Sequence, residues 1–355
     1  MQQLIESRKE DHVKICLNED VKAHYNYWDD IRFIHHALPE IDFSEIDTRA
    51  EVLGKKLSSP IIISAITGGY TKAETINRNL AKAASDLEIG FGVGSQRAGL
   101  EDVGLAKTYS VVKDYDIPLV IGNIGAPQLI SQHDTEPLDE EKIKEAFNMI
   151  DADVLAVHLN YLQEVVQPEG NVNAKGCLAA LNQLALRYPI IAKETGSGIS
   201  RKTAMDLKSA HVIGIDVGGL GGTSFSAVEV YRAKEKEDIL KERIGRTFWN
   251  WGIPTPVSVI EANVGLNVIA TGGIRNGVDV ARALVLGASS AGMAGALLKA
   301  ATLVPEKVIE QLEGVIHELK VTMFLVGAQN ISLLENAEVV ITGRTRDWME
   351  QMGGH

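Results

Sequence analysis

Eight short apolar runs, separated by amphipathic segments, constrain the fold of this chain more than any other feature. The runs lie at residues 60–65, 89–92, 118–121, 154–158, 190–193, 213–217, 267–270 and 290–293. They are apolar on both faces, as the strands of a parallel sheet covered by helices must be. The segments between them, such as 75–87, 140–151 and 277–286, repeat apolar residues at the helical period of about 3.6. Eight such strand–helix units predict an α/β protein with a closed (β/α)8 barrel, a TIM barrel.

The length of the chain and its patterning favour a single domain. The 355 residues are 45% hydrophobic, which is enough to bury a large core. Neither a linker nor an internal repeat interrupts the pattern, so we expect one domain over residues 1–355. Residues 1–54 form an N-terminal extension before the first strand, and residues 305–355 form a C-terminal helical tail.

Composition excludes several classes of function. No apolar segment is long enough to span a bilayer, and no signal-peptide pattern begins at Met1. Cys16 and Cys177 are too few and too far apart for a disulfide framework or a metal knuckle, which favours a reducing compartment. A net charge of -12 argues against nucleic acid as a partner. We therefore expect a cytoplasmic protein that binds neither nucleic acid nor membrane, and that gathers positive charge locally if its ligand is an anion.

Glycine-rich segments follow most of the predicted strands. The loops after the strands build the active face of a (β/α)8 barrel. Glycine lets the backbone approach a flat or anionic ligand because no Cβ stands in the way. The segments are residues 64–69, 92–97, 122–126, 193–196, 218–224, 271–275 and 292–295. Their recurrence after so many strands indicates one large ligand site at this end of the barrel.

The last two of these segments predict a phosphate site. Gly272 and Gly273 precede a helix, and Ala294 and Gly295 follow the next strand, where many barrels bind phosphate with backbone N–H groups and a helix N-terminus. Arg275 would add charge-assisted hydrogen bonds. The alternative is a tight turn followed by a solvated arginine.

Lys193, after the fifth strand, extends this prediction to flavin mononucleotide (FMN). An ammonium group beside the pyrimidine edge of a flavin stabilises the negative charge of the reduced ring. The alternative is a structural ion pair.

A polar cluster follows the fourth strand. His158, Asn160, Gln163 and Glu164 place an imidazole, two amides and a carboxylate within seven residues at a strand end, where α/β proteins concentrate chemistry. The alternative is a capped loop with a hydrogen-bonded core histidine.

The order of motifs along the chain resembles type 2 isopentenyl-diphosphate isomerase. The motifs that carry this resemblance lie at residues 8–12, 67–69, 92–97, 158–170, 214–223, 251–255 and 343–348. They cover essentially the whole chain. Two departures are visible, since Asn171 stands where the family commonly has Asp and Gly99 where Ala is usual. The first removes a charge near the expected metal site.

The resemblance implies an FMN-dependent barrel enzyme that interconverts isopentenyl diphosphate and dimethylallyl diphosphate. The reaction is a 1,3-proton shift without net redox change, in which reduced FMN assists and NAD(P)H or another reductant only primes the flavin. The family also implies Mg²⁺ as a second cofactor and a homotetramer or homo-octamer.

The residue roles that fit this scheme fall into four groups. Glu164 is the expected Mg²⁺ ligand, because Mg²⁺ prefers one or two carboxylates together with phosphate oxygens and water. His158, Asn160 and Gln163 are the expected catalytic residues, with Gln163 positioning a water or the substrate. The expected diphosphate clamp consists of Arg8, Lys9, Gln96 and Arg97, with Ser95 and Gln163 beside the substrate. The expected flavin contacts are Ala65, Ile66, Thr67, Ser95, Asn123, Lys193, Thr223, Gly272, Gly273, Arg275, Ala294 and Gly295.

Two other functions and one segment stay open at this stage. A flavin oxidoreductase of the 2-hydroxy-acid-oxidase type shares the barrel, the lysine and the phosphate loop, but it needs a His–Arg pair that is missing after the seventh strand. A non-catalytic binder of a phosphate ligand is the other alternative. The densely charged segment 231–246 is either an exposed amphipathic helix or a lid that orders over bound diphosphate.

Overall fold

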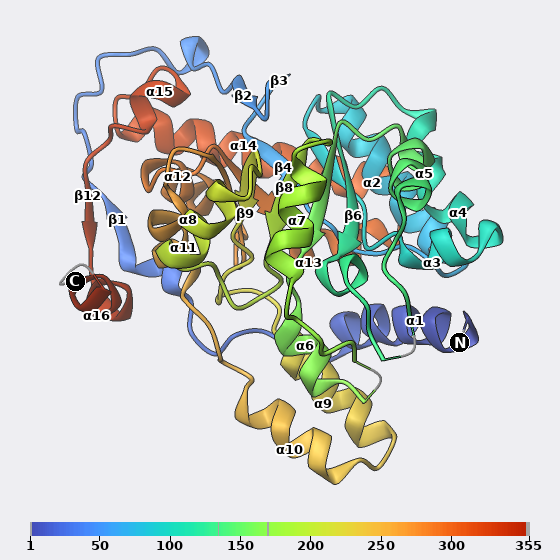
Figure 1. Ribbon diagram of the computed structural model, residues 1–355. Helices are drawn as coiled ribbons and strands as arrows, with labels where there is room; N and C mark the ends of the chain where they lie inside the picture. Colours follow the sequence, from blue (N-terminus) through green and yellow to red (C-terminus); the bar gives the residue numbers. More distant parts are fainter. Residues whose placement is uncertain (1, 134, 169, 353–355) are drawn as a thin grey trace.

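A ring of eight parallel strands forms the centre of the computed structural model (Figure 1), which describes residues 2–133, 135–168 and 170–352, with side chains from residue 8 onward. The strands are β4 (Ile61–Ile63), β5 (Gly90–Gly92), β6 (Leu119–Gly125), β7 (Val154–His158), β8 (Ile190–Lys193), β9 (Gly214–Asp216), β10 (Asn267–Thr271) and β11 (Ser290–Met293). The ring closes between β11 and β4, where Gly292 lies opposite Ile62. The predicted TIM barrel is therefore confirmed. The largest difference is at β6, which continues past Ile121 to Gly125 because β7 pairs with it as far as His158.

Helices follow the strands and cover the outside of the ring. They are α2 (Ala73–Asp86), α3 (Arg97–Glu101), α4 (Val103–Ser110), α5 (Glu140–Ile150), α6 (Tyr161–Val166), α7 (Cys177–Ala185), α8 (Arg201–Ser209), α9 (Phe225–Glu235), α10 (Ile239–Thr247), α11 (Thr255–Ala262), α12 (Gly277–Val285) and α13 (Gly295–Ala301). Short 3₁₀ turns lie at η3 (Val111–Asp114) and η4 (Ala126–Leu129). The helices expected at 75–87, 140–151 and 277–286 are α2, α5 and α12.

Local sequence explains where such a helix starts and which face it buries. The carboxylate of Asp139 accepts a hydrogen bond from the Lys142 N–H and so caps the first turn of α5. Ile143, Ala146 and Ile150 then lie on one face of α5 and are buried against the barrel. Apolar residues therefore recur at the 3.6-residue period because only one face of the helix is buried.

A hairpin from the N-terminal extension closes the bottom of the barrel. It consists of β2 (Ala50–Val52) and β3 (Lys55–Leu57), which pair antiparallel. Val52 and Leu57 are buried in one cluster with the isoleucines inside the ring. The Leu53 N–H donates to the side-chain carbonyl of Asn267 at the start of β10. With this end sealed, a ligand can enter only from the carboxyl ends of the strands.

Helix α1 (Gln2–Asn18) lies at that opposite end and contacts α3, α9 and α13, which begin there (Figure 1). Ile15 in α1 and Val21 just after it pack against Ala227 and Val228 of α9. The two parts of the extension therefore serve opposite ends of the barrel.

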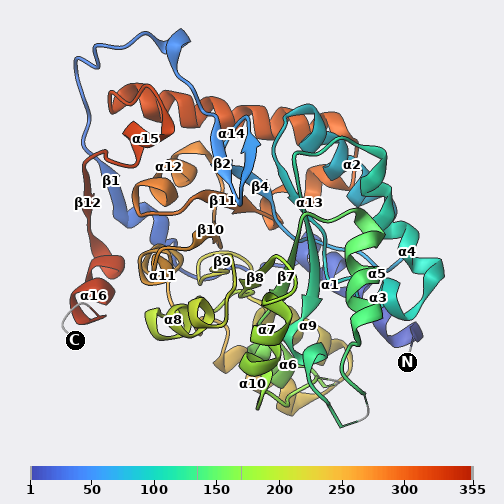
Figure 2. The ribbon, with the colours of Figure 1, turned by 45° about the horizontal axis from the view of Figure 1, so that its top comes forward.

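The C-terminal segment returns to the extension. Helix α14 (Pro305–Leu325) packs against α2 and α12, as Figure 2 shows, and α15 (Ile331–Leu334) follows it. The tail is not entirely helical, because β12 (Val339–Ile341) pairs antiparallel with β1 (Ile31–Phe33). Helix α16 (Gly343–Met352) packs against η1 (Tyr27–Asp30), and η2 (Phe43–Glu45) lies between β1 and β2. The expected tail also includes residues 353–355, which lie outside the described residues.

None of the helices in the described part of the chain combines the length and the apolar character that crossing a bilayer requires.

The packing of α12 on α14 generates a stability prediction. A Cβ on Gly277 would lie 2.2 Å from the Leu319 nitrogen and 2.3 Å from the Val315 oxygen, both backbone atoms. We expect Gly277→Ala to lower the free energy of unfolding by about 2–3 kcal/mol, because neither backbone can move aside freely. Gly314 in α14 has no atom within 4 Å of the same position, so Gly314→Ala serves as the control. It should stabilise the protein by about 0.5–1 kcal/mol, since alanine is the better helix former. Equal effects of the two substitutions in urea unfolding would contradict this account.

Candidate active site

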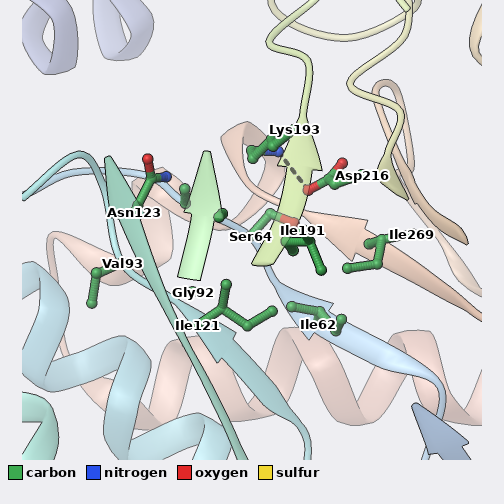
Figure 3. A pocket seen from close by; sticks show the side chains of 12 residues that line it. Ile62, Ser64, Gly92, Val93, Ile121, Asn123, Ile191, Lys193, Asp216 and Ile269 are labelled. Carbon is green, nitrogen blue, oxygen red and sulfur yellow. Dashed lines mark hydrogen bonds and ion pairs between the residues drawn. The ribbon is translucent and has the colours of Figure 1, made fainter. Parts of the chain in front are cut away.

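Polar side chains gather around the open end of the barrel. Asn123, Lys193 and Asp216 line a small hollow whose lower wall is made of isoleucines. Figure 3 shows these polar groups toward the carboxyl ends of the strands and Ile62 and Ile121 below them. Ala65, one of the expected flavin contacts, also lines the hollow. The site is therefore apolar below and charged at its rim.

Lys193 forms a buried ion pair with Asp216. Its ammonium nitrogen lies 2.6 Å from Asp216 Oδ2, and both side chains are almost fully buried. The hydroxyl of Thr271 donates to the other carboxylate oxygen. Lys193 thus makes the structural ion pair that the sequence left open and also faces the hollow. Asp216 is not among the site residues predicted from the sequence. A carboxylate at the end of an apolar strand is the signal that could have identified it.

His158 is a neutral imidazole at the rim. Its Nδ1 lies 2.7 Å from Asn123 Oδ1, and the ring also makes a hydrogen bond with the Ile124 backbone. Burial, reinforced by the positive charges of Lys9 and Lys193, lowers the pKa of His158 to about 3. The imidazole is therefore uncharged at neutral pH.

Gln96 takes a different place from the one expected. Its side chain is fully buried, its amide nitrogen donates to the Ala146 carbonyl, and its amide oxygen accepts from the Asn123 N–H. Both ends of the amide are therefore bound to backbone. The prediction that Gln96 grips the diphosphate is not supported, because the residue instead fixes the strand segment that carries Asn123.

Helix α6 presents the rest of the polar cluster. The Gln163 amide is held at both ends, since its nitrogen donates to Glu229 Oε1 at 3.3 Å and its oxygen accepts from the Asn160 amide at 3.3 Å. Glu164 accepts hydrogen bonds from Asn160 at 2.9 Å, Gln167 at 2.7 Å and the Asn171 N–H at 2.6 Å. Both groups are thus fixed in orientation before any ligand binds.

Glu164 is the single carboxylate of this cluster. No group of three or more His, Cys, Asp or Glu residues in the described ranges could hold a metal ion. Mg²⁺ needs only one or two protein carboxylates where phosphate and water supply its other ligands. Asn171 contributes its backbone N–H, which an aspartate there would also supply. Glu169, within the 158–170 motif, lies outside the described residues.

Glu229 on α9 connects this cluster to α1 and was not foreseen. Its buried carboxylate lies 2.9 Å from His12 Nε2 and 2.7 Å from Arg232 Nη1. Burial alone would raise the pKa of Glu229, but the bond from His12 and the charge of Arg232 outweigh it and hold the pKa at about 2. Burial lowers the pKa of His12, so the imidazole donates as a neutral group. A glutamate on an amphipathic helix carries no sequence signal that distinguishes it from a solvated one.

A cationic cluster from two distant segments lies beside the hollow. The Lys9 ammonium donates to the Ser95 carbonyl at 2.9 Å, which places α1 over the loop after β5. Burial, together with the charges of Arg8 and Arg97, lowers the pKa of Lys9 to about 7. Arg97 also pairs with Glu101 at 2.8 Å. The expected clamp residues Arg8, Lys9 and Arg97 are therefore brought together by the fold.

The loops after β9, β10 and β11 form a cradle of small residues. A Cβ on Gly222 would lie 2.7 Å from the Gly273 nitrogen, and one on Gly295 would lie 3.1 Å from the Thr223 hydroxyl. Gly272 and Gly273 have φ angles of +118° and +80°, which favour glycine. Among the described residues, the Gly273 N–H donates to no protein acceptor. Backbone donors bordered by small residues and a helix start (Ala294 precedes α13) fit a phosphate group.

Arg275 pairs with two carboxylates beside the loop after β10. Its guanidinium lies 2.9 Å from Asp279 and 3.3 Å from Asp29. These pairs fix the loop after β10, and the expected contact of Arg275 with phosphate stays a prediction.

The loop after β4 completes the hollow wall. Thr67 is buried, and its carbonyl accepts from the Gly94 N–H at 3.1 Å, so the loops after β4 and β5 are joined. Ile66, between Ala65 and Thr67, is half-buried. The small and apolar wall, the charged pair at its edge and the cradle together fit the ring and the phosphate of FMN.

Comparison with known families agrees with this site. The family model described as FMN-dependent dehydrogenase matches residues 6–133 and 254–341. Among solved structures, a putative lactate oxidase of Pediococcus acidilactici has a TM-score of 0.63 at 15% identity, covering 96% of this chain and 94% of that one. A mandelate oxidase variant with a monooxide FMN adduct has a TM-score of 0.61 at 17% identity, with coverages of 89% and 90%. At such low identity these structures show the shared fold only.

Curated relatives are far more similar. The isopentenyl-diphosphate delta-isomerase of Picrophilus torridus is 48% identical, covering 98% of this chain and 99% of its own. The protein of the same name from Archaeoglobus fulgidus is 45% identical with the same coverages, and that of Halobacterium salinarum is 46% identical, covering 98% and 96%. With this identity over nearly whole chains and a matching FMN-dependent family model, the chain belongs to the isopentenyl-diphosphate delta-isomerase family, in its FMN-dependent type 2 branch.

Proposed function

We propose that this protein interconverts isopentenyl diphosphate and dimethylallyl diphosphate by a 1,3-proton shift, assisted by reduced FMN and Mg²⁺, in isoprenoid biosynthesis. The observation that carries the proposal is the pairing of two features at one barrel end. A hollow with an apolar floor and the Lys193–Asp216 pair at its rim lies beside the Arg8, Lys9 and Arg97 cluster. In a protein of net charge -12, such a cluster indicates an anionic substrate.

The residues that would hold FMN come from several loops. The cradle formed by Gly222, Thr223, Gly272, Gly273 and Gly295 would take the phosphate, and Lys193 would face the ring. When bound, reduced FMN supplies acid–base chemistry and an electron-rich face that stabilises positive charge on the substrate. Ala65, Ile66 and Thr67 exclude water from the apolar side of the hollow.

The substrate is an anion at one end and an alkene at the other. Arg8, Lys9 and Arg97 bind the diphosphate end and neutralise its charge. Because α1 contacts α3, α9 and α13, it covers the mouth of the barrel and keeps water from a cation-like transition state.

The α6 residues orient the alkene end. With one amide hydrogen of Gln163 donated to Glu229, the other is left to hold a water or the substrate. Asn160 fixes the same amide from the other side, and His158 stays uncharged. These groups position atoms and move protons by hydrogen bonding, while the buried charges remain on Glu229 and Arg232.

The direct test is product analysis under anaerobic conditions. Protein loaded with FMN, reduced with dithionite and supplied with Mg²⁺ should convert isopentenyl diphosphate into dimethylallyl diphosphate without consuming reductant. In deuterated water the product should carry deuterium at the newly protonated carbon, as seen by NMR. Oxidation of lactate or mandelate with net electron transfer, and without isomerisation, would show that the protein is a 2-hydroxy-acid oxidase instead. Protein that binds no flavin would leave only a non-catalytic binder.

Glu164 is proposed as the Mg²⁺ ligand. In Glu164→Gln, the Mg²⁺ concentration for half-maximal activity should rise by at least about tenfold, because removing a direct ligand exceeds the effect of losing an outer partner. FMN affinity should stay unchanged, which serves as the control for folding. An unaltered Mg²⁺ requirement would show that the diphosphate carries the metal without help from this carboxylate.

Lys9 gives the reaction a pH dependence. Its pKa of about 7 in the free enzyme means that the ammonium is charged below pH 7 and loses its proton as the pH rises. The value of kcat/KM should therefore fall above about pH 7, since this ratio reports groups of the free enzyme. Lys9→Arg should abolish this fall, because a guanidinium stays protonated. A descending limb that is identical in both proteins would assign it to another group.

Four finer points belong to the same proposal. NAD(P)H serves as a reductant that primes the flavin, the chain assembles as a homotetramer or homo-octamer, and the reaction takes place in the cytoplasm.

The segment 231–246, which spans parts of α9 and α10, orders further over bound diphosphate. Helix α10 already contacts α6 through Lys241, whose ammonium donates to the Val165 carbonyl. Light scattering gives the subunit count, and protease sensitivity with and without substrate tests the lid.

A further inference from the structure

We propose that Trp28 is a positioning residue for the phosphate of FMN, and that the C-terminal segment 342–345 holds Trp28 in place. The inference rests on the proposed flavin site. It assigns a role to the 343–348 motif, which the proposed reaction does not otherwise use.

Trp28 reaches the phosphate loop from far away in the sequence. Its indole is fully buried, and the indole N–H donates to the Gly272 carbonyl at 2.9 Å across 244 residues. In a trans peptide the carbonyl and the following N–H lie in one plane and point in opposite directions. Holding the Gly272 carbonyl therefore directs the Gly273 N–H to the other side, toward Gly222 and the cradle.

The surrounding backbone leaves no room for a side chain at Gly272. A Cβ on Gly272 would lie 2.3 Å from the Gly219 oxygen and 2.6 Å from the Thr255 hydroxyl. The Gly219 N–H in turn donates to the Thr271 carbonyl at 2.9 Å. The loops after β9 and β10 thus pack backbone to backbone, and Trp28 supplies the hydrogen bond that sets the orientation of the Gly272–Gly273 peptide.

The C-terminal segment fixes the turn that carries Trp28. The Thr345 N–H donates to Asp30 Oδ2 at 2.9 Å, and its hydroxyl lies 2.8 Å from that oxygen and 3.2 Å from the Tyr27 carbonyl. The Thr342 N–H donates to the Asp30 carbonyl at 2.9 Å. Thr345 is fully buried. Both neighbours of the Trp28–Asp29 pair are therefore bound to the last strand–helix junction of the chain.

This arrangement prepares the phosphate site before FMN arrives. If the Gly272 carbonyl loses its donor, the peptide can rotate in the free protein, and binding must then reorder it. Loss of this hydrogen bond should raise the Kd for FMN by about three- to tenfold, the range expected for one net hydrogen bond. Riboflavin has no phosphate, so its affinity should not change.

The experiment compares FMN and riboflavin binding to full-length apoprotein by quenching of flavin fluorescence. Trp28→Phe keeps an aromatic ring but removes the N–H, and it should raise the Kd for FMN while leaving that for riboflavin as in the wild type. Trp348→Phe is the matched control, since that indole is half-exposed on α16. It should change neither Kd.

The role of the C-terminal segment is tested separately. Thr345→Val removes the hydroxyl at nearly constant volume, and it should also raise the Kd for FMN without changing that for riboflavin. Thr345→Ser keeps the hydroxyl and should bind FMN with the affinity of the wild type. The double variant Trp28→Phe/Thr345→Val should lose less FMN binding free energy than the sum of the losses in the two single variants.

The outcomes separate the inference from the proposed function. Equal weakening of FMN and riboflavin by Trp28→Phe, or no weakening at all, would overturn the inference and leave the flavin site standing. Wild-type protein that binds neither flavin would overturn the proposed function itself.

Discussion

Closing eight parallel strands into a ring is the constraint on which the rest of this molecule depends. Parallel strands end on the same side, so closure brings their last residues around one rim even though the chain places them far apart. His158, Lys193 and Asp216 end three neighbouring strands at this rim, and Asn123 lies close to the end of β6 beside them. The β2–β3 hairpin seals the opposite end with Val52 and Leu57, so the rim is the side from which a ligand can enter.

The segments outside the ring give the site its charge and its rigidity. Helix α1 carries Arg8 and Lys9 to the rim and is tied to α9 by the His12–Glu229 bond and by apolar contacts. Two pairs of buried charges match each other, Glu229 with Arg232 and Lys193 with Asp216, which makes their burial tolerable. At the other side of the rim, Trp28 and the C-terminal segment fix the glycine cradle. The two ends of the chain thus act on the two ends of one ligand site.

Much of the site could be predicted because strand ends are visible in the sequence. His158, Lys193 and Gly272 each follow an apolar run, and the structure places all of them at the rim. What the sequence does not reveal is the partner of a side chain when that partner is remote. Gln96 sits in a motif that looks ligand-binding, yet it turns inward to the Ala146 and Asn123 backbone. Arg275 follows the phosphate loop, but Asp279 and Asp29 hold it.

The barrel, its open end and the kinds of residue around that end can be predicted from the sequence, because periodicity and turn chemistry are local properties of the chain. Which of these residues share a hydrogen bond depends on how the whole chain folds. Glu229 reaches Gln163 across 66 residues and Trp28 reaches Gly272 across 244. Such pairs cannot be recognised in one sequence, since the residues around a glutamate or tryptophan do not show which remote residue its side chain contacts. Ring closure and the packing of the two chain ends bring them within reach of each other.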